Sequence, residues 1–338
     1  MRRPIYGQVV VGPPGSGKTT YCNGMQQYLR LLGRDVGVLN LDPANTIVPF
    51  ETIFDIRAEI VDLASVMKEA DLGPNGGLMY CMEYLDAHVD EIINEKLNDR
   101  LSDYVILDFP GQVELFTHSP CVHRFLHRLV KAFDLRLTMV QLIDSQYCTD
   151  AQKFLSAALL GTTTMIRLEL PAINVLSKVD LIAQYGELPM QLDFFTDCQD
   201  LDRLLPFLHH QPDSGVAPDG DNSYLDDEEY QAARRKRMRS PLEVKFAKMH
   251  AAIAGVVGDF GLLNFLPLEI SSAESVGRVL AQIDKSNGYV FTKGSANEDL
   301  FKSAIAQNEM SYEVAAEVRE RISSPDTISE LRRTRNKK

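Results

Sequence analysis

A stretch near the amino terminus has the residue types and spacing of a phosphate-binding loop. It follows a run rich in β-branched residues and precedes a run with helical periodicity. Glycines let backbone N–H groups turn inward around phosphate oxygens, and the N-terminus of the following helix adds a partial charge of about +0.5. We expect Lys18 to reach the β and γ phosphates of a nucleotide and the Thr19 hydroxyl to ligate Mg²⁺. The predicted contacts are Gly12, Pro13, Pro14, Gly15, Ser16, Gly17, Lys18, Thr19 and Thr20.

A second group of candidate residues has the form Asp-x-x-Gly, in Asp108-Phe109-Pro110-Gly111-Gln112. Asp108 can hold Mg²⁺ through water, and Gly111 can direct its N–H at the γ-phosphate. Gln112 and Glu114 then follow where a side chain can orient an attacking water. Taken alone, Glu114 is also explained as an acidic residue that favours a helix N-terminus. Jointly these residues predict a switch that responds to the γ-phosphate.

Asp42 is a further candidate for the metal shell or for the attacking water. It lies at the end of a predicted strand, in Asp42-Pro43-Ala44-Asn45, where Pro43 stops the strand so that the chain can leave as a switch segment. The alternative is a plain strand-ending turn. We therefore expect Thr19, Asp42 and Asp108 to form the metal shell.

Guanine recognition is predicted from Ser177-Lys178-Val179-Asp180, which follows another strand-like run. The Asp180 carboxylate can accept hydrogen bonds from the guanine N1–H and 2-amino groups, and the Lys178 stem can lie across the base. Adenine lacks this pair of donors and would leave the carboxylate unsatisfied, at roughly 1–3 kcal/mol or more. Ser177 stands where many GTPases have Asn, which makes base selectivity less certain. Ser272 and Ala273, after a later strand, can present a backbone N–H to the guanine O6.

These motifs must be positioned by alternating strands and helices, the pattern of a doubly wound, mostly parallel α/β sheet. In such folds ligands bind beyond the carboxyl ends of the strands, where all of these residues fall. We expect one P-loop GTPase domain over residues 1–290, with a flexible excursion at about 211–240, followed by C-terminal helices and a basic tail over 291–338. The predicted strands are Ile5–Val11, Val36–Leu41, Tyr104–Phe109, Leu137–Ile143, Ala172–Leu176 and Leu266–Ile270. The predicted helices are Gly17–Leu32, Tyr80–Leu97, Glu114–Phe133, Asp150–Leu168, Pro241–Val257 and two within Glu298–Ile322.

Composition narrows the class of protein. The chain has 338 residues, of which 45% are hydrophobic, enough to bury a substantial core. A formal charge of −12 argues against broad nucleic-acid binding. No apolar run reaches the roughly 18–20 residues of a membrane span, and the start of the chain does not have the pattern of a signal peptide. Five scattered cysteines suit a reducing compartment, so we expect a cytosolic or nuclear protein without a membrane partner.

The motifs together resemble the GPN-loop GTPases, with the eukaryotic second paralogue as the closest match. The resemblance rests on the phosphate loop, Asp42–Asn45, Gly73-Pro74-Asn75, Asp108–Leu115 and Ser177–Asp180, in that order, and runs from Gln8 to about Gly288. It implies a GTP-hydrolysing dimer related to signal-recognition and MinD-type proteins, using GTP, GDP and Mg²⁺, with a GPN insertion at about 71–77.

The same resemblance implies a partner subunit that is either identical or a paralogous GPN-loop GTPase. It places Asn75 in the partner's pocket as a catalytic residue, although the tripeptide by itself predicts only a tight turn. It further implies that RNA polymerase subunits or assembly factors are partners and that the protein is cytoplasmic with shuttling to the nucleus.

Three other interpretations remain open at this point. A scaffold that binds GTP and GDP differently but barely hydrolyses GTP needs the same pocket. A P-loop phosphotransferase has a similar phosphate loop, but the guanine motif argues against it. A zinc site is conceivable from His118, Cys121, His123 and His127, since two of the histidines are spaced i and i+4.

Overall fold

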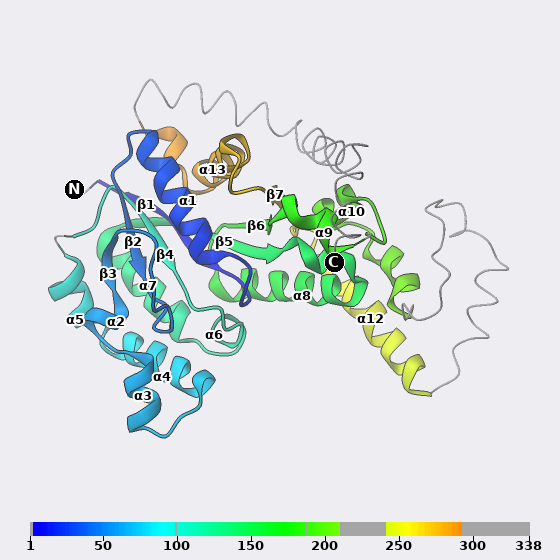
Figure 1. The fold of residues 1–338 in the computed structure, drawn as a ribbon, viewed down its shortest axis with the longest axis horizontal. Coiled ribbons are helices and arrows are strands. Elements are labelled where there is room, and N and C mark those ends of the chain that lie inside the picture. Colours follow the sequence, from blue (N-terminus) through cyan, green and yellow to red (C-terminus); the bar gives the residue numbers. More distant parts are fainter. Residues whose placement is uncertain (1–2, 99, 187, 210–240, 293–338) are drawn as a thin grey trace, which may run out of the picture.

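A single parallel sheet organises the chain (Figure 1). The computed structural model describes residues 3–98, 100–186, 188–209 and 241–292. Within these residues the sheet has seven strands in the order β3-β2-β4-β1-β5-β6-β7, and every neighbouring pair is parallel. The strands are β1 (Ile5–Val11), β2 (Val36–Asn40), β3 (Thr52–Asp55), β4 (Tyr104–Asp108), β5 (Leu135–Asp144), β6 (Ala172–Ser177) and β7 (Phe265–Leu268).

Strand residues alternate between two hydrophobic layers, as the period of two in a strand requires. In β1, Val9 and Val11 belong to one layer and Val10 belongs to the other. In β4, Leu107 and Ile106 divide in the same way. Both faces of the sheet are therefore covered, which explains why these strands read as nearly continuous apolar runs.

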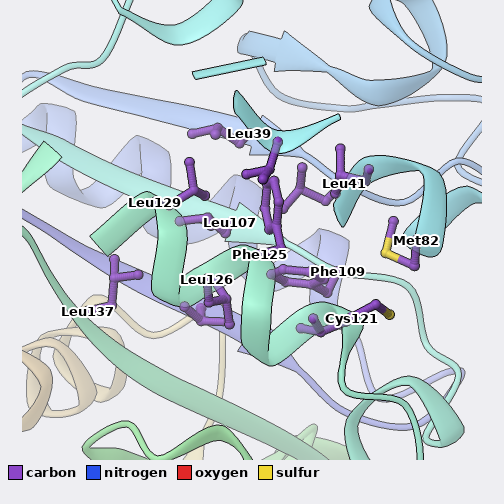
Figure 2. Packing of buried hydrophobic residues seen from close by; sticks show 14 of the residues in the cluster. Leu39, Leu41, Met82, Leu107, Phe109, Cys121, Phe125, Leu126, Leu129 and Leu137 are labelled. Carbon is purple, nitrogen blue, oxygen red and sulfur yellow. The ribbon is translucent and has the colours of Figure 1, made fainter. Parts of the chain in front are cut away.

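Helices supply the cover on each face. Helices α1 and α13 pack on one face, and α7 packs on the other with α4 outside it (Figure 1). Figure 2 shows Phe125, Leu126 and Leu129 of α7 packed toward Leu39 and Leu107 of the sheet. The principal helices are α1 (Lys18–Leu31), α3 (Leu63–Glu69), α4 (Pro74–Ala87), α6 (Glu114–Thr117), α7 (Cys121–Phe133), α8 (Ala151–Leu168), α10 (Leu192–Asp197), α12 (Pro241–Phe260) and α13 (Ala273–Asn287).

Short helical turns join these elements near the ends of the strands. Helices α8, α10 and α12 enclose a third apolar cluster at the β6–β7 side of the sheet, around Phe154 and Phe195. The short elements are α2 (Ile56–Glu59), α5 (Val89–Glu91), the π-helical η1 (Ile92–Leu97), η2 (Ser145–Thr149), η3 (Val179–Leu181), α9 (Ile182–Tyr185), η4 (Leu201–His209) and η7 (Tyr289–Phe291).

The doubly wound α/β fold predicted from the sequence is confirmed, but some element boundaries were wrong. The predicted helix Glu114–Phe133 breaks between α6 and α7, because Pro120 has no N–H to continue the helix and restricts the residue before it. The predicted helix Tyr80–Leu97 instead starts at Pro74 and changes to π-helical geometry at Ile92. Strand β3 and helix α13 were missed.

Some predictions fall where the structure cannot test them. The excursion at 211–240 and the helices predicted within 298–322 lie outside the described residues, as does most of the segment 291–338. The boundary between the two predicted regions stays a prediction. Within the described part of the chain, no helix combines the length and the apolar character needed to span a bilayer.

Candidate functional site

The phosphate loop follows β1 and leads directly into α1. Gly12, Gly15 and Gly17 have φ values of 149°, 78° and 88°, which side chains rarely adopt. A Cβ at Gly12 would lie 2.3 Å from the carbonyl oxygen of Leu142, so the close approach of the loop to β5 also requires glycine. Pro13 and Ser16 are buried, whereas Pro14, Gly15 and Thr20 are exposed. The loop therefore has the local conformation that its glycine spacing predicts.

Lys18 and Thr19 form the first turn of α1 and meet Asp108 at the end of β4. The Lys18 Nζ donates to the carbonyl oxygen of Pro13 at 3.2 Å, and the Thr19 hydroxyl donates to Asp108 Oδ2 at 3.1 Å. Burial lowers the pKa of Lys18, while the nearby Asp108 and Asp42 oppose that change. The structure thus gathers a cation, a hydroxyl and a carboxylate from segments about ninety residues apart in sequence.

Asp108 is the most perturbed carboxylate of this group. Its side chain is almost fully buried, and Oδ1 has no N–H or O–H donor among the described residues. Burial raises the pKa of Asp108 to about 7, against the hydrogen bond from Thr19 and the charge of Lys18, which both lower it. The thiol of Cys22 adjoins the carboxylate, and burial raises its pKa well above the usual value.

Asp42 lies beyond the end of β2, beside Lys18. Its Oδ1 accepts a hydrogen bond from the Ala44 N–H at 2.9 Å, and burial raises its pKa against the effects of that bond and of Lys18. Asn45, in the same turn, donates from Nδ2 to the Thr19 hydroxyl at 3.4 Å. Hydroxyl and carboxylate oxygens are the ligands that Mg²⁺ prefers, and Asp108 Oδ1 is an unsatisfied oxygen at this place, so Thr19, Asp42 and Asp108 fit the predicted metal shell.

Gly111 brings the switch motif against the phosphate loop. A Cβ at Gly111 would lie 2.9 Å from Lys18 Nζ and 3.0 Å from Pro14 Cα, so the absence of a side chain permits this contact. Gln112 follows, and its Nε2 donates to Asn75 Oδ1 at 2.5 Å. Glu114 is the exposed first residue of α6, the position that an acidic residue favours at a helix N-terminus.

Asn75 lies in the first turn of α4, and not in the tight turn that the tripeptide alone predicted. Gly73 is the N-cap of α4, and Pro74 occupies the first turn, where its missing N–H is not required. An ion pair joins Asp86, near the end of α4, to Arg124 of α7, and a second pair joins Asp90 of α5 to Arg128 of α7. Three of these four side chains are at least 49% exposed, so the pairs add little stability by themselves.

The predicted guanine motif lies at the end of β6, beside the phosphate loop. The Ser177 hydroxyl, buried at this place, lies 2.7 Å from the carbonyl oxygen of Ser16, to which it donates. Lys178 has a φ of 58° and donates from Nζ to the carbonyl oxygen of Gly15 at 2.6 Å. Asp180 is exposed and is the middle residue of η3. Ser177 therefore bonds the phosphate loop, a contact that the sequence interpretation did not anticipate.

Ser272 and Ala273 lie at the start of α13, at the same edge of the sheet. Leu268 pairs with Ser177 across β6 and β7, which brings the turn after β7 toward the guanine motif. The Ser272 hydroxyl caps α13 by accepting from the Ser275 N–H at 3.3 Å. Ala273 is exposed in the first turn of that helix.

Sequence reasoning missed Asp144 and Asn45. Asp144 ends β5 and its Oδ2 accepts a hydrogen bond from Lys178 Nζ at 2.6 Å. The signal was available, because Asp144 directly follows the predicted strand Leu137–Ile143, as Asp42 and Asp108 come at the ends of theirs. Asn45 was quoted only as part of a motif, and its contact with Thr19 depends on the turn geometry.

The zinc alternative receives no support. In the described ranges, no three or more His, Cys, Asp or Glu side chains are grouped so that they could hold a metal ion. His123 and His127 stack with ring centroids 6.2 Å apart, and His123 Nε2 lies 3.5 Å from Glu169. Cys121, the first residue of α7, is buried in the hydrophobic core.

Comparison with known proteins identifies the family. A family model described as "Conserved hypothetical ATP binding protein" matches residues 10–289. The GPN-loop GTPase QQT1 of Arabidopsis thaliana is 44% identical over 327 residues, covering 96% of this chain and 100% of that protein. GPN-loop GTPase 2 of Saccharomyces cerevisiae is 38% identical over 296 residues, covering 87% of this chain and 78% of that protein. The chain belongs to the GPN-loop GTPase family.

Membership of the GPN-loop GTPase family confirms the resemblance inferred from the motifs, and with it the enzyme class, a GTPase. A solved GTPase of Pyrococcus abyssi in its apo form shares the fold, with a TM-score of 0.55 at 23% identity. That likeness covers 83% of this chain and 97% of the other. The individual site residues of this GPN-loop GTPase stay predictions, which the geometry above makes specific.

Proposed function

We propose that this chain binds GTP with Mg²⁺ and hydrolyses it to GDP and phosphate. The observation that carries the proposal is the convergence of Lys18, Thr19 and Asp108 at the phosphate loop, with Gly111 packed against Lys18. Bound Mg²⁺ would neutralise charge on the β and γ phosphates. Catalysis then comes from positioning and charge stabilisation, without a covalent enzyme intermediate.

Each residue has a separate part in this proposal. The Lys18 ammonium leaves the Pro13 carbonyl to bond the phosphates, while Asp108 accepts the hydrogen of the Thr19 hydroxyl and so directs the hydroxyl lone pairs outward. Asp42 completes the oxygen shell. Because the Gln112 Nε2 group is bonded to Asn75, its carbonyl oxygen can accept a hydrogen bond from the attacking water. Glu114 can act on that water only from the exposed end of α6.

Guanine selectivity is assigned to Asp180, with Lys178 across the base and the Ala273 N–H near the O6 atom. Asp180 is exposed, so its carboxylate is accessible to the N1–H and 2-amino donors. Competition of ATP with a fluorescent GTP analogue measures this preference. Tighter binding of ATP than of GTP would contradict the assignment, and would favour a P-loop phosphotransferase instead.

Single-turnover hydrolysis of radiolabelled GTP by the purified protein tests the catalytic part. We expect Mg²⁺-dependent release of phosphate, no tight nucleotide binding by Lys18→Ala, and a folded Lys18→Ala chain by circular dichroism. Normal GTP binding with no phosphate release above background over hours would instead support a nucleotide-dependent scaffold.

A dimeric site is part of the proposal, with Asn75 reaching the γ-phosphate bound by an identical or paralogous subunit. Support comes from the resemblance and from the exposed position of Asn75 at the N-terminus of α4. Mixing Asn75→Ala with Gln112→Leu subunits tests it, because a mixed dimer then contains one complete composite site. If Asn75 acts only on Gln112 of its own chain, no mixed site is complete and the activity of the mixture equals the sum of the two variants.

The cellular role is proposed from the resemblance alone. We assign to this GTPase a role in RNA polymerase assembly and nuclear import, with polymerase subunits or assembly factors as partners and a cytoplasmic location with shuttling to the nucleus. Membranes and nucleic acids are not expected partners. Affinity purification from cells in the GTP-bound and GDP-bound states tests this role, and absence of polymerase components from both samples would contradict it.

A further inference from the structure

Asp144 belongs to none of the predicted motifs, yet both oxygens of its carboxylate accept hydrogen bonds at the site. It ends β5, and its side chain is only 12% exposed. Its Oδ1 accepts from the Gln146 N–H at 2.9 Å and caps η2, while its Oδ2 accepts from Lys178 Nζ at 2.6 Å. The two oxygens therefore have separate structural tasks, one local and one directed at the guanine motif.

Lys178 is held from several directions. Its ammonium bonds both the Gly15 carbonyl oxygen and Asp144, and its own carbonyl oxygen accepts from the Ser145 hydroxyl at 2.9 Å. Its stem crosses the phosphate loop, since Cε lies 3.8 Å from where a Cβ of Gly17 would stand. These contacts fix the flexible lysine side chain in one direction across the loop. The backbone of Lys178 has a φ of 58°, which is unusual for a residue with a side chain.

We propose that Asp144 is a positioning residue for nucleotide binding, which fixes the Lys178 stem so that it forms one wall of the base pocket. The proposal rests on the proposed guanine-nucleotide function, and it assigns to Asp144 no contact with the nucleotide. The Lys178 ammonium is held by two acceptors, the Gly15 carbonyl oxygen of the phosphate loop and the Asp144 carboxylate at the end of β5. A base then enters against an ordered lysine stem and need not order it on binding.

Charge and position predict opposite effects of Asp144→Asn, which makes the proposal easy to test. The asparagine keeps an acceptor for the Gln146 N–H and removes the carboxylate that pairs with Lys178. If Asp144 acted only through its charge, removing a negative group near an anionic ligand would tighten binding. If it positions Lys178, binding weakens by about tenfold, the scale expected for loss of a charge-assisted hydrogen bond.

Asp150→Asn is a matched control. Asp150 also caps a helix, α8, with its Oδ1 on the Gln152 N–H at 2.9 Å, and its charge is paired with Lys153 instead of Lys178. The same change of charge and the same retention of a cap are therefore made nearby without touching the guanine motif. We expect GDP affinity within about twofold of the unmodified protein for this control.

The experiment is a titration of a fluorescent GDP analogue with the unmodified chain, Asp144→Asn, Asp150→Asn, Lys178→Met and the Asp144→Asn/Lys178→Met double variant. We expect a loss of about tenfold for Asp144→Asn alone and no further loss when Asp144→Asn is added to Lys178→Met. Asp144→Asn should lower the affinity for IDP, which lacks the 2-amino group, by the same factor as the affinity for GDP. The affinity for inorganic pyrophosphate should not change. Unchanged pyrophosphate affinity also shows that Asp144→Asn has kept the phosphate loop folded.

Unchanged or tighter GDP binding by Asp144→Asn overturns the proposal. So does a loss of GDP affinity that is as large when Asp144→Asn is added to Lys178→Met as when it is made in the unmodified chain. An equal loss of pyrophosphate binding shows a general structural defect and also overturns it. Failure of the proposed function gives a different result, because the unmodified chain then binds neither GDP nor IDP above the level of Lys18→Ala.

Discussion

The ionised Asp108 carboxylate should destabilise the protein in the absence of ligand, because its charge is buried where little water can solvate it. The proposed function nevertheless requires the ionised form. Its pKa is raised to about 7 from an ordinary 3.8, with burial as the largest cause. The folded state therefore binds the Asp108 proton more tightly than the unfolded chain does. The free energy of unfolding consequently falls as the pH rises from about 4 to about 7, the interval in which the unfolded chain is ionised and the folded protein still holds the proton.

The magnitude follows from the size of that pKa change. A change of about three units corresponds to about 4 kcal/mol when the group is fully ionised in both states, above about pH 8. As the pH falls from 7 to 4, the folded protein takes up the proton and the destabilisation disappears. About 2 kcal/mol of the destabilisation should remain near pH 5.5. Asp108→Asn removes the ionisation and keeps an acceptor for the Thr19 hydroxyl, so it should stabilise the nucleotide-free protein by about these amounts.

Urea unfolding of both proteins at pH 8, 7, 6 and 5.5, in EDTA and without nucleotide, measures the difference. The gain in unfolding free energy from Asp108→Asn should be largest at pH 8 and should shrink as the pH falls. The same variant should lose Mg²⁺-dependent GTP hydrolysis. A less stable Asp108→Asn protein at pH 8, or a difference that does not vary with pH, would refute the reasoning.

The remaining predictions concern packing, base selectivity and a buried ion pair. Gly111→Ala should weaken GTP binding by about tenfold, because its Cβ would displace the ammonium of Lys18; unchanged affinity in a fluorescent titration would contradict this. Asp180→Asn should let xanthosine nucleotides compete better against GTP, and a variant with the original preference would argue against Asp180. Asp284→Asn should cost about 3 kcal/mol of unfolding free energy or more, since Arg34 and Asp284 have side chains only 7% and 1% exposed. A loss below about 1 kcal/mol in urea unfolding would show that this pair is not important for stability.

The sequence by itself determined the fold class, the family and the local chemistry of the phosphate loop. Strand and helix periodicity are local properties, and the glycine spacing from Gly12 to Gly17 specifies a backbone shape within a few residues. The predicted strands β1, β2, β4, β5 and β6 differ from the observed ones by a few residues at most. Strand β3 was not predicted, because a strand of four residues is too short to show a periodic pattern in the sequence.

The tertiary structure decided which distant residues share the site. The contact of Gln112 with Asn75 depends on how α4 packs against α7, and a tripeptide cannot show that its proline begins a helix. The bond from Lys178 to Asp144 depends on the pairing of β5 with β6, which sets Asp144 opposite Ser177. Register between parallel strands is a long-range property, determined by how helices on both faces pack, so residue spacing along the chain carries no direct record of it.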